Sequence, residues 1–172
     1  MNKIFSAIRP IILRTTGVPE CVLANSNKIA VRGEYATVLI AQDTQHGWGT
    51  IERKLSDDGR DITITNKYTV TYDLTVNFFR GNAIERASKL MRIQYLPLVS
   101  DELLSKGFSI INCSNVMNLT ALQSQSFEER SSITLTLATK ENVSETVGRI
   151  LSCGCTVKDE KDKILSTITI GK

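Results

Sequence analysis

The chain has 172 residues, of which 41% are hydrophobic and 23% charged, a composition typical of one globular domain rather than a fibrous or disordered protein. The chain has 21 lysines and arginines and 18 aspartates and glutamates, so its net charge is only +3. Positive and negative residues are interspersed along the sequence, which argues against a dedicated duplex-DNA binder. No stretch approaches the roughly 18 apolar residues of a membrane span, and Arg9 and Pro10 interrupt the N-terminal apolar run before it could act as a signal peptide. We therefore expect a soluble protein of the reducing cytoplasm, with four free cysteines.

The first predicted element is a helix over residues 2–14, where isoleucines recur at helical spacing. Pro10 is expected to kink or split it, and Gly17 to end it. A strand is predicted at 35–41, rich in β-branched residues. Residues 42–61, here called the arm, then contain three glycines, many charges and the only tryptophan. Such a long connection predicts a projecting hairpin or a functional loop.

The clearest pattern runs from Ile62 to Phe78, where apolar residues alternate with threonines, as in a long half-buried strand. Gly81 ends it, and a helix is predicted over 82–95 with Asn82 as N-cap and Glu85 completing a capping box.

Shorter elements complete the chain. A helical turn is predicted over 101–106, closed by Gly107. Three strands are predicted at 108–117, 131–139 and about 163–170, and the segment 143–151 is either a turn of helix or a strand end. The order of elements predicts an α+β fold over residues 1–172 as a single domain: a mixed, largely antiparallel sheet covered on one face by helices, with the arm projecting.

No pattern of catalytic residues emerges. His46 is the only histidine, and neither a G-x-S-x-G elbow nor a cysteine-protease signature accompanies it. Cys153-Gly-Cys155 lacks the second pair that structural zinc needs, and is better explained by two strand-end thiols around a turn glycine. Gly47-Trp48-Gly49 lacks the third glycine of a dinucleotide loop. We therefore expect no enzyme activity, no metal and no cofactor.

Several motifs resemble the phage neck-terminator (tail-terminator) family over about residues 3–150, whereas 153–172 do not fit its pattern. An Asn-Leu-Thr stretch precedes an aromatic residue, acidic residues and an arginine, and then a long strand. The matching residues are Tyr35-Ala-Thr-Val, Phe78-Phe79, Gly81-Asn82-Ala83, Leu103-Leu104, Gly107-Phe108, Asn118-Leu119-Thr120-Ala121-Leu122 and Phe127-Glu128-Glu129-Arg130-Ser131.

The resemblance implies a structural virion protein of a tailed bacteriophage, located in the neck and assembled in the host cytoplasm. Such proteins form a ring, typically a hexamer, that caps the tail tube and joins it to the head-side connector or head-completion protein. In contractile phages the ring also meets the tail sheath. Genome DNA passes through the lumen without sequence recognition, and no membrane is involved. A ring also agrees with the physics of assembly, because head-to-tail contacts between identical subunits form a closed ring when the rotation from one subunit to the next permits it.

Two groups of residues are candidate contacts with a neighbouring subunit or partner. In the arm, Trp48 and Ile51 would be apolar anchors and Glu52, Arg53 and Lys54 would set orientation, unless Trp48 folds back onto its own domain. Glu128, Glu129 and Arg130 form the second group. There Arg130 would pair with a carboxylate of a neighbouring subunit, or with Glu85 or Asp101, unless the group is only a solvated charge cluster.

Other functions stay open. Another ring-forming connector or a tail-tube subunit belongs to the same class. A single-strand nucleic-acid binder would need aromatic platforms in a basic groove, whereas Tyr68 and Tyr72 share the apolar face of Val70 and Leu74. An enzyme would require chemistry from His46 or Cys155 and is the weakest alternative.

Overall fold

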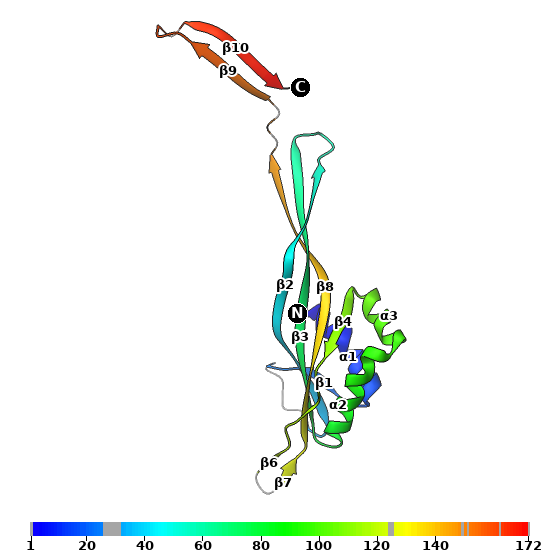
Figure 1. Cartoon of the computed structure of the whole chain (residues 1–172). Helices are drawn as coiled ribbons and strands as arrows, with labels where there is room; N and C mark the ends of the chain where they lie inside the picture. The colour runs from blue at the N-terminus through cyan, green and yellow to red at the C-terminus, as the bar shows by residue number, and fades with distance from the viewer. Residues whose placement is uncertain are drawn as a thin grey trace. The chain divides into compact units, whose positions relative to one another are not determined.

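The computed structural model describes residues 2–25, 32–123, 126–148, 150, 152–161 and 163–171 (Figure 1). The chain divides into two compact units: residues 1–47 with 68–141, and residues 48–67 with 142–172. Three long strands contribute to both units. Whether the whole chain behaves as one cooperative domain stays a prediction.

The first unit begins with a helix and a short strand and contains most of the sheet. Its elements, including the strands that continue into the second unit, are α1 (Asn2–Thr16), β1 (Cys21–Leu23), β2 (Tyr35–Leu55), β3 (Asp61–Phe79), α2 (Ala83–Met91), the 3-10 helix η1 (Arg92–Tyr95), α3 (Pro97–Ser105), β4 (Phe108–Cys113), β5 (Met117–Asn118), β6 (Ala121–Gln123), β7 (Ser126–Glu128) and β8 (Arg130–Gly148). The second unit adds β9 (Ser152–Lys158) and β10 (Ile164–Gly171).

The main sheet has the order β1-β2-β3-β8-β4, and β5 also pairs with β8. β1 is parallel to β2, while β4 and β5 are antiparallel to β8. The helices α1, α2 and α3 pack on the sheet and share one apolar core with it (Figure 1). The predicted α+β fold, with a mixed and largely antiparallel sheet, is confirmed.

The alternation predicted for the long strand explains this core. Val70, Leu74, Val76 and Phe78 are all buried on one side of β3. Because successive side chains of a strand point to opposite faces, the threonines between them lie on the other face. The buried side of β3 meets fully buried residues of the helices and of β8: Ile8, Ile11, Ile12, Leu90, Leu103, Leu135 and Leu137.

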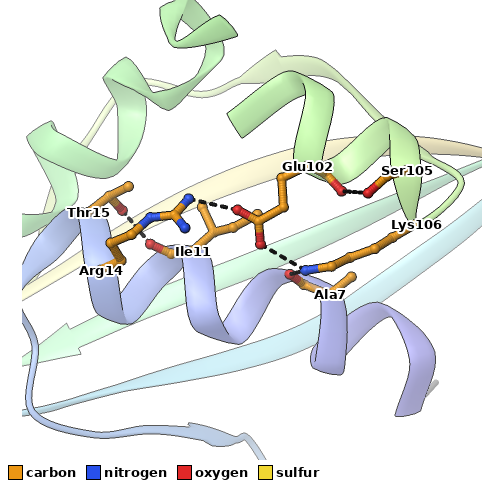
Figure 2. Close-up of polar contacts among 7 residues, drawn as sticks. All are labelled: Ala7, Ile11, Arg14, Thr15, Glu102, Ser105 and Lys106. Atoms are coloured by element: carbon orange, nitrogen blue, oxygen red, sulfur yellow. Dashed lines mark hydrogen bonds and ion pairs between the residues drawn. The ribbon is translucent and has the colours of Figure 1, made fainter. Parts of the chain in front are cut away.

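An ion-pair network also ties α1 to α3 (Figure 2). The Glu102 carboxylate accepts hydrogen bonds from Arg14 Nη2 at 2.7 Å and from Lys106 Nζ at 2.9 Å. Lys106 Nζ also lies 3.4 Å from the carbonyl oxygen of Ala7 in α1. These two cations hold the pKa of Glu102 below its usual value, with the Lys106 hydrogen bond the larger cause.

The helix ends differ in part from the prediction. α1 continues past Pro10, which does not split it, and ends as expected at Gly17, whose φ is 67°. The predicted capping box at Asn82 is wrong: Asn82 has a left-handed backbone and its side chain makes no capping hydrogen bond. Glu85 pairs instead with Lys89. The α-helix α2 also ends at Met91, with a 3-10 turn after it, rather than continuing to residue 95.

Other predicted boundaries shift. Pro97, at the first position of α3, opens that helix four residues before the predicted start. The ambiguous segment at 143–151 is strand as far as Gly148, so β8 is much longer than predicted. The strand predicted at 108–117 is two strands, β4 and β5. β9 was not predicted.

The arm is a hairpin, and the loop alternative is wrong. β2 runs without a break to Leu55, and β3 begins at Asp61. The turn between them is closed by Ser56 N–H donating to the Asp61 carbonyl at 2.9 Å, and Gly59 has a φ of 69° that favours glycine. Residues 41–55 are all exposed, which explains why their polar composition resembled that of a loop.

Candidate interaction surfaces

Trp48, the predicted anchor, is almost fully accessible, with 93% of its surface exposed. It therefore does not fold back onto the described part of the chain. Gly47 and Gly49 flank it, with φ values of 69° and 72°. A Cβ at Gly49 would lie 2.6 Å from the carbonyl oxygen of Lys67, so the two strands of the hairpin approach each other here as only glycine allows.

In the second unit, the end of the arm lies in a three-stranded surface with the start of β3 and the end of β8, and one face of this surface is polar. The Thr63 and Thr146 hydroxyls lie 3.3 Å apart, and those of Thr65 and Ser144 lie 2.9 Å apart. Both contacts join β3 to β8. Since alternate residues share a face, the even positions of β3 and the odd positions of β8 lie on the opposite side.

The opposite side is apolar. A Cβ at Gly49 would lie 2.5 Å from Asn66 Oδ1, so the odd positions of β2 share a face with the even positions of β3. We call this surface the apolar arm face; its large apolar residues are Ile51, Leu55, Ile62, Ile64, Val143 and Val147. Exposed fractions of 55% for Ile51 and 61% for Val143 show that the described residues leave this surface open to solvent.

The charges predicted to orient the arm have different surroundings. Glu52 pairs with Lys67 at 2.7 Å across the hairpin, so part of its role is internal to the arm. Arg53 and Lys54 are exposed and form no ion pair within the ranges that the structure describes. These two cations are therefore the charges of the predicted group that a partner could use.

The second predicted group lies in the first unit, where Glu128 bridges two arginines. Its carboxylate accepts hydrogen bonds from Arg80 Nε at 2.9 Å and from Arg130 Nε at 2.8 Å. These contacts lower the pKa of Glu128, with the Arg130 hydrogen bond the largest cause. The Arg130 guanidinium also lies 5.2 Å from the centre of the Phe79 ring, and Phe79 stacks on Tyr35 at 4.6 Å. The cluster is thus built into the fold.

Glu129 explains how α2 begins without a side-chain cap from Asn82. Its carboxylate accepts a hydrogen bond from Ile84 N–H at 3.3 Å, satisfying one of the free amides at the start of the helix. Its own carbonyl accepts from Arg80 N–H at 2.7 Å. Arg80 and Asn82 both have positive φ, so the segment that precedes β8 holds an unusual backbone turn in place.

Sequence reasoning missed one exposed apolar pair as a site. In the β6–β7 hairpin, Leu122 and Phe127 are cross-strand partners, and they are 63% and 75% exposed. Phe127 entered the sequence argument only through its motif. The sequence did contain a signal for this pair, because Phe127 and Leu122 each stand in a short, otherwise polar segment.

The residues considered for chemistry lie on different strands, His46 in β2 and Cys153 and Cys155 in β9. His46 Nε2 lies 2.8 Å from the Thr71 hydroxyl. Cys153 and Cys155 lie in β9 and are exposed, so the expected turn at Gly154 is wrong: it is a strand residue. Burial raises the pKa of Cys21 and of Cys113 to about 11.

Among the residues whose placement is described, no three His, Cys, Asp or Glu side chains form a group that could hold a metal. None of the helices in that part of the chain combines the length and the apolar character that a membrane crossing requires.

Comparison with known protein families identifies a match. Residues 2–161 of the chain match the family described as phage neck terminator protein. The match includes β9, so the similarity extends further toward the C-terminus than the motifs had indicated. No curated protein matches the chain.

Proposed function

This chain belongs to the phage neck terminator family and is a structural protein of the phage neck, and from that premise we propose that it forms a ring of identical subunits, a hexamer, that ends the tail tube. The ring joins the tube to the head-side connector and, in a contractile phage, also contacts the sheath. Genome DNA passes through its lumen without being read. The subunit assembles in the host cytoplasm.

The observation that carries the proposal is the amount of large apolar surface left exposed on a structural protein of this family. Trp48, Leu98, Phe127 and Val143 are between 61% and 93% exposed and come from four separate elements. Aromatic and aliphatic residues of this kind are enriched at the centre of protein interfaces. A subunit with several unlike apolar surfaces is suited to head-to-tail contacts with copies of itself and to contacts with different partners above and below.

Within this arrangement we assign the arm to partner contacts. Trp48 at 93% exposure would enter a pocket of an adjacent virion protein, and Arg53 and Lys54 would pair with its acidic groups. Glu128, Glu129 and Arg130 would act indirectly, because they hold the turn before α2 and the base of the β6–β7 hairpin.

Mass determination of the purified protein, alone and mixed with tail-tube subunits, tests the ring. We expect a closed oligomer on the tube, with about 1,200–2,000 Å² buried between each pair of neighbours. A monomer at every concentration that also fails to bind tail tubes would refute the proposal.

The role of the arm is tested separately with Trp48→Ala, using Tyr95→Ala as a matched control because Tyr95 is an aromatic residue, 75% exposed, outside the arm. We expect rings of Trp48→Ala to form but to capture heads poorly, whereas Tyr95→Ala joins heads to tails normally. Normal joining by Trp48→Ala would remove the arm from the proposal and leave the ring intact.

A further inference from the structure

We propose that the C-terminal hairpin, β9 with β10, covers the apolar arm face of a neighbouring copy of this chain. The inference rests on the proposed ring, since it names the contact that two neighbouring subunits make. It gives a role to a hairpin whose residues lie outside the motifs that resemble the family.

The hairpin has two chemically different faces. Cys155 pairs with Ile168, and Val157 pairs with Ser166, in the antiparallel register. Directly opposed residues share a face, so this side is mainly apolar. The other side carries Thr156 opposite Thr167.

Nothing in the described part of the chain covers that apolar side. Every residue of β9 is exposed, and Val157 and Ile168 have exposed fractions of 45% and 54%. A two-stranded hairpin is at best marginally stable in water, because it has no core of its own. A cover over its apolar side would stabilise it.

The apolar arm face needs a partner of this kind. Its central strand contributes Ile62 and Ile64, while the outer strands place Arg53 and Glu145 on the same side by the alternation established above. Neither charge has an ion-pair partner among the residues with described positions. A suitable cover must therefore be flat and apolar, and narrow enough to leave both charges in water.

The C-terminal hairpin meets each requirement. Strands lie about 4.8 Å apart, so two strands cover the middle of a three-stranded surface and leave its outer edges open. Sheets pack face to face at about 10 Å through apolar side chains. The apolar side of the hairpin carries no charged residue between Ser152 and Val157 or between Ser166 and Ile168, so docking would bury no unpaired charge.

A second copy is the occupant that the observations favour. The arm face and the hairpin face are both exposed. They are unlike surfaces on one subunit, as a head-to-tail contact requires, and repeating the same contact around a ring covers both faces in every copy.

Two matched charge variants test the contact, Ile168→Lys on the apolar side of β10 and Thr167→Lys on its polar side. With full-length protein and tail tubes that lack the ring, we expect Ile168→Lys to weaken assembly more than about tenfold, because an unpaired charge would be buried. Thr167→Lys should assemble normally. Equal assembly of both variants would overturn the inference while leaving the ring proposal intact, whereas failure of the unaltered protein to assemble would refute the ring itself.

The native thiols provide a second readout that does not depend on a charge variant. Cys153 and Cys155 should be alkylated readily in the free protein and lose that reactivity in assembled rings. Thiols that stay equally reactive after assembly would contradict the contact.

Disulfide trapping identifies the occupant. Copies with Val143→Cys but with both Cys153 and Cys155 changed to serine are mixed with unaltered copies. Assembly followed by mild oxidation should give a cross-link between the two kinds of chain. If Val143→Cys in an otherwise unaltered chain instead links to its own hairpin, the cover is intramolecular and the inference is wrong.

Discussion

Removing residues 48–67, which include most of the arm and the start of β3, should leave the first unit folded while abolishing head–tail joining. The change replaces residues 48–67 with a four-residue turn that contains glycine, and so connects Gly47 to Tyr68. The two ends are already close, because Gly49 lies against Lys67 in the hairpin. Residues 48–67 belong to the second unit and contribute no side chain to the buried core.

The size of the stability change follows from what is removed. The ion pair of Glu52 with Lys67 has both side chains about half exposed, and such a pair contributes at most about 1 kcal/mol. The hydroxyl contacts of Thr63 and Thr65 with β8 are also lost, and each of these exposed contacts contributes about 0.5 kcal/mol, the low end for a hydrogen bond. Against this, closing a loop of four residues instead of twenty lowers the entropic cost of folding by about 1.4 kcal/mol. The two effects nearly cancel, so the melting temperature should change by less than about 4 °C.

Circular dichroism during heating measures this change, and complementation of a phage that lacks the protein measures joining. We expect cooperative melting near that of the unaltered chain together with loss of head–tail joining, because the change removes Trp48 and also the β2 and β3 residues of the apolar arm face. A shortened protein without a cooperative transition would show that the arm belongs to the core. Normal infectivity would show that the arm has no docking role.

Three further results are expected. Leu74→Ala should destabilise the fold by about 2–5 kcal/mol in denaturant unfolding, since Leu74 is fully buried and the loss leaves a cavity; a smaller effect would mean that the site collapses. Glu128→Gln should lower stability at pH 7, but the difference from the unaltered protein should shrink as the pH falls through the lowered pKa of Glu128, because protonation removes the same two ion pairs; a difference that is independent of pH would contradict this. Brief alkylation at pH 8 should label Cys153 and Cys155 in the free protein but spare Cys21, because burial raises the pKa of Cys21 to about 11. Mass spectrometry of the peptides measures the labelling, and faster labelling of Cys21 would contradict this expectation.

Local sequence patterns predicted the parts of the fold in which the burial of each residue is determined by its position among its sequence neighbours. The buried side of β3 was predicted because alternation of apolar residues and threonines continues through the core. The start of α2 was also predicted, since Asn82 occupies the N-cap position, but the group that caps it was not, because the cap comes from Glu129, 45 residues away in the sequence. Pairing of this kind between distant segments leaves no local signal.

The same reasoning applies to the candidate surfaces. Trp48 could be recognised because a tryptophan in a polar segment with glycines is unusual. The apolar arm face could not, because Val143 and Val147 come from a strand nearly a hundred positions after Ile51, and only the pairing of β3 with β8 places them on one face. β9 was missed because exposed cysteines and glycine are not typical strand residues.

The distance between Glu129 and the helix it caps has a consequence for synthesis on the ribosome. Arg80 reaches Glu128 over 48 positions, and the start of α2 reaches Glu129 over 45. A nascent chain that ends before residue 128 therefore has α2 with an open amide end, and the left-handed turn at Arg80 and Asn82 lacks the contacts that Glu128 and Glu129 provide. The helical layer would close only after β8 begins to emerge, which makes completion of this unit a late event in translation.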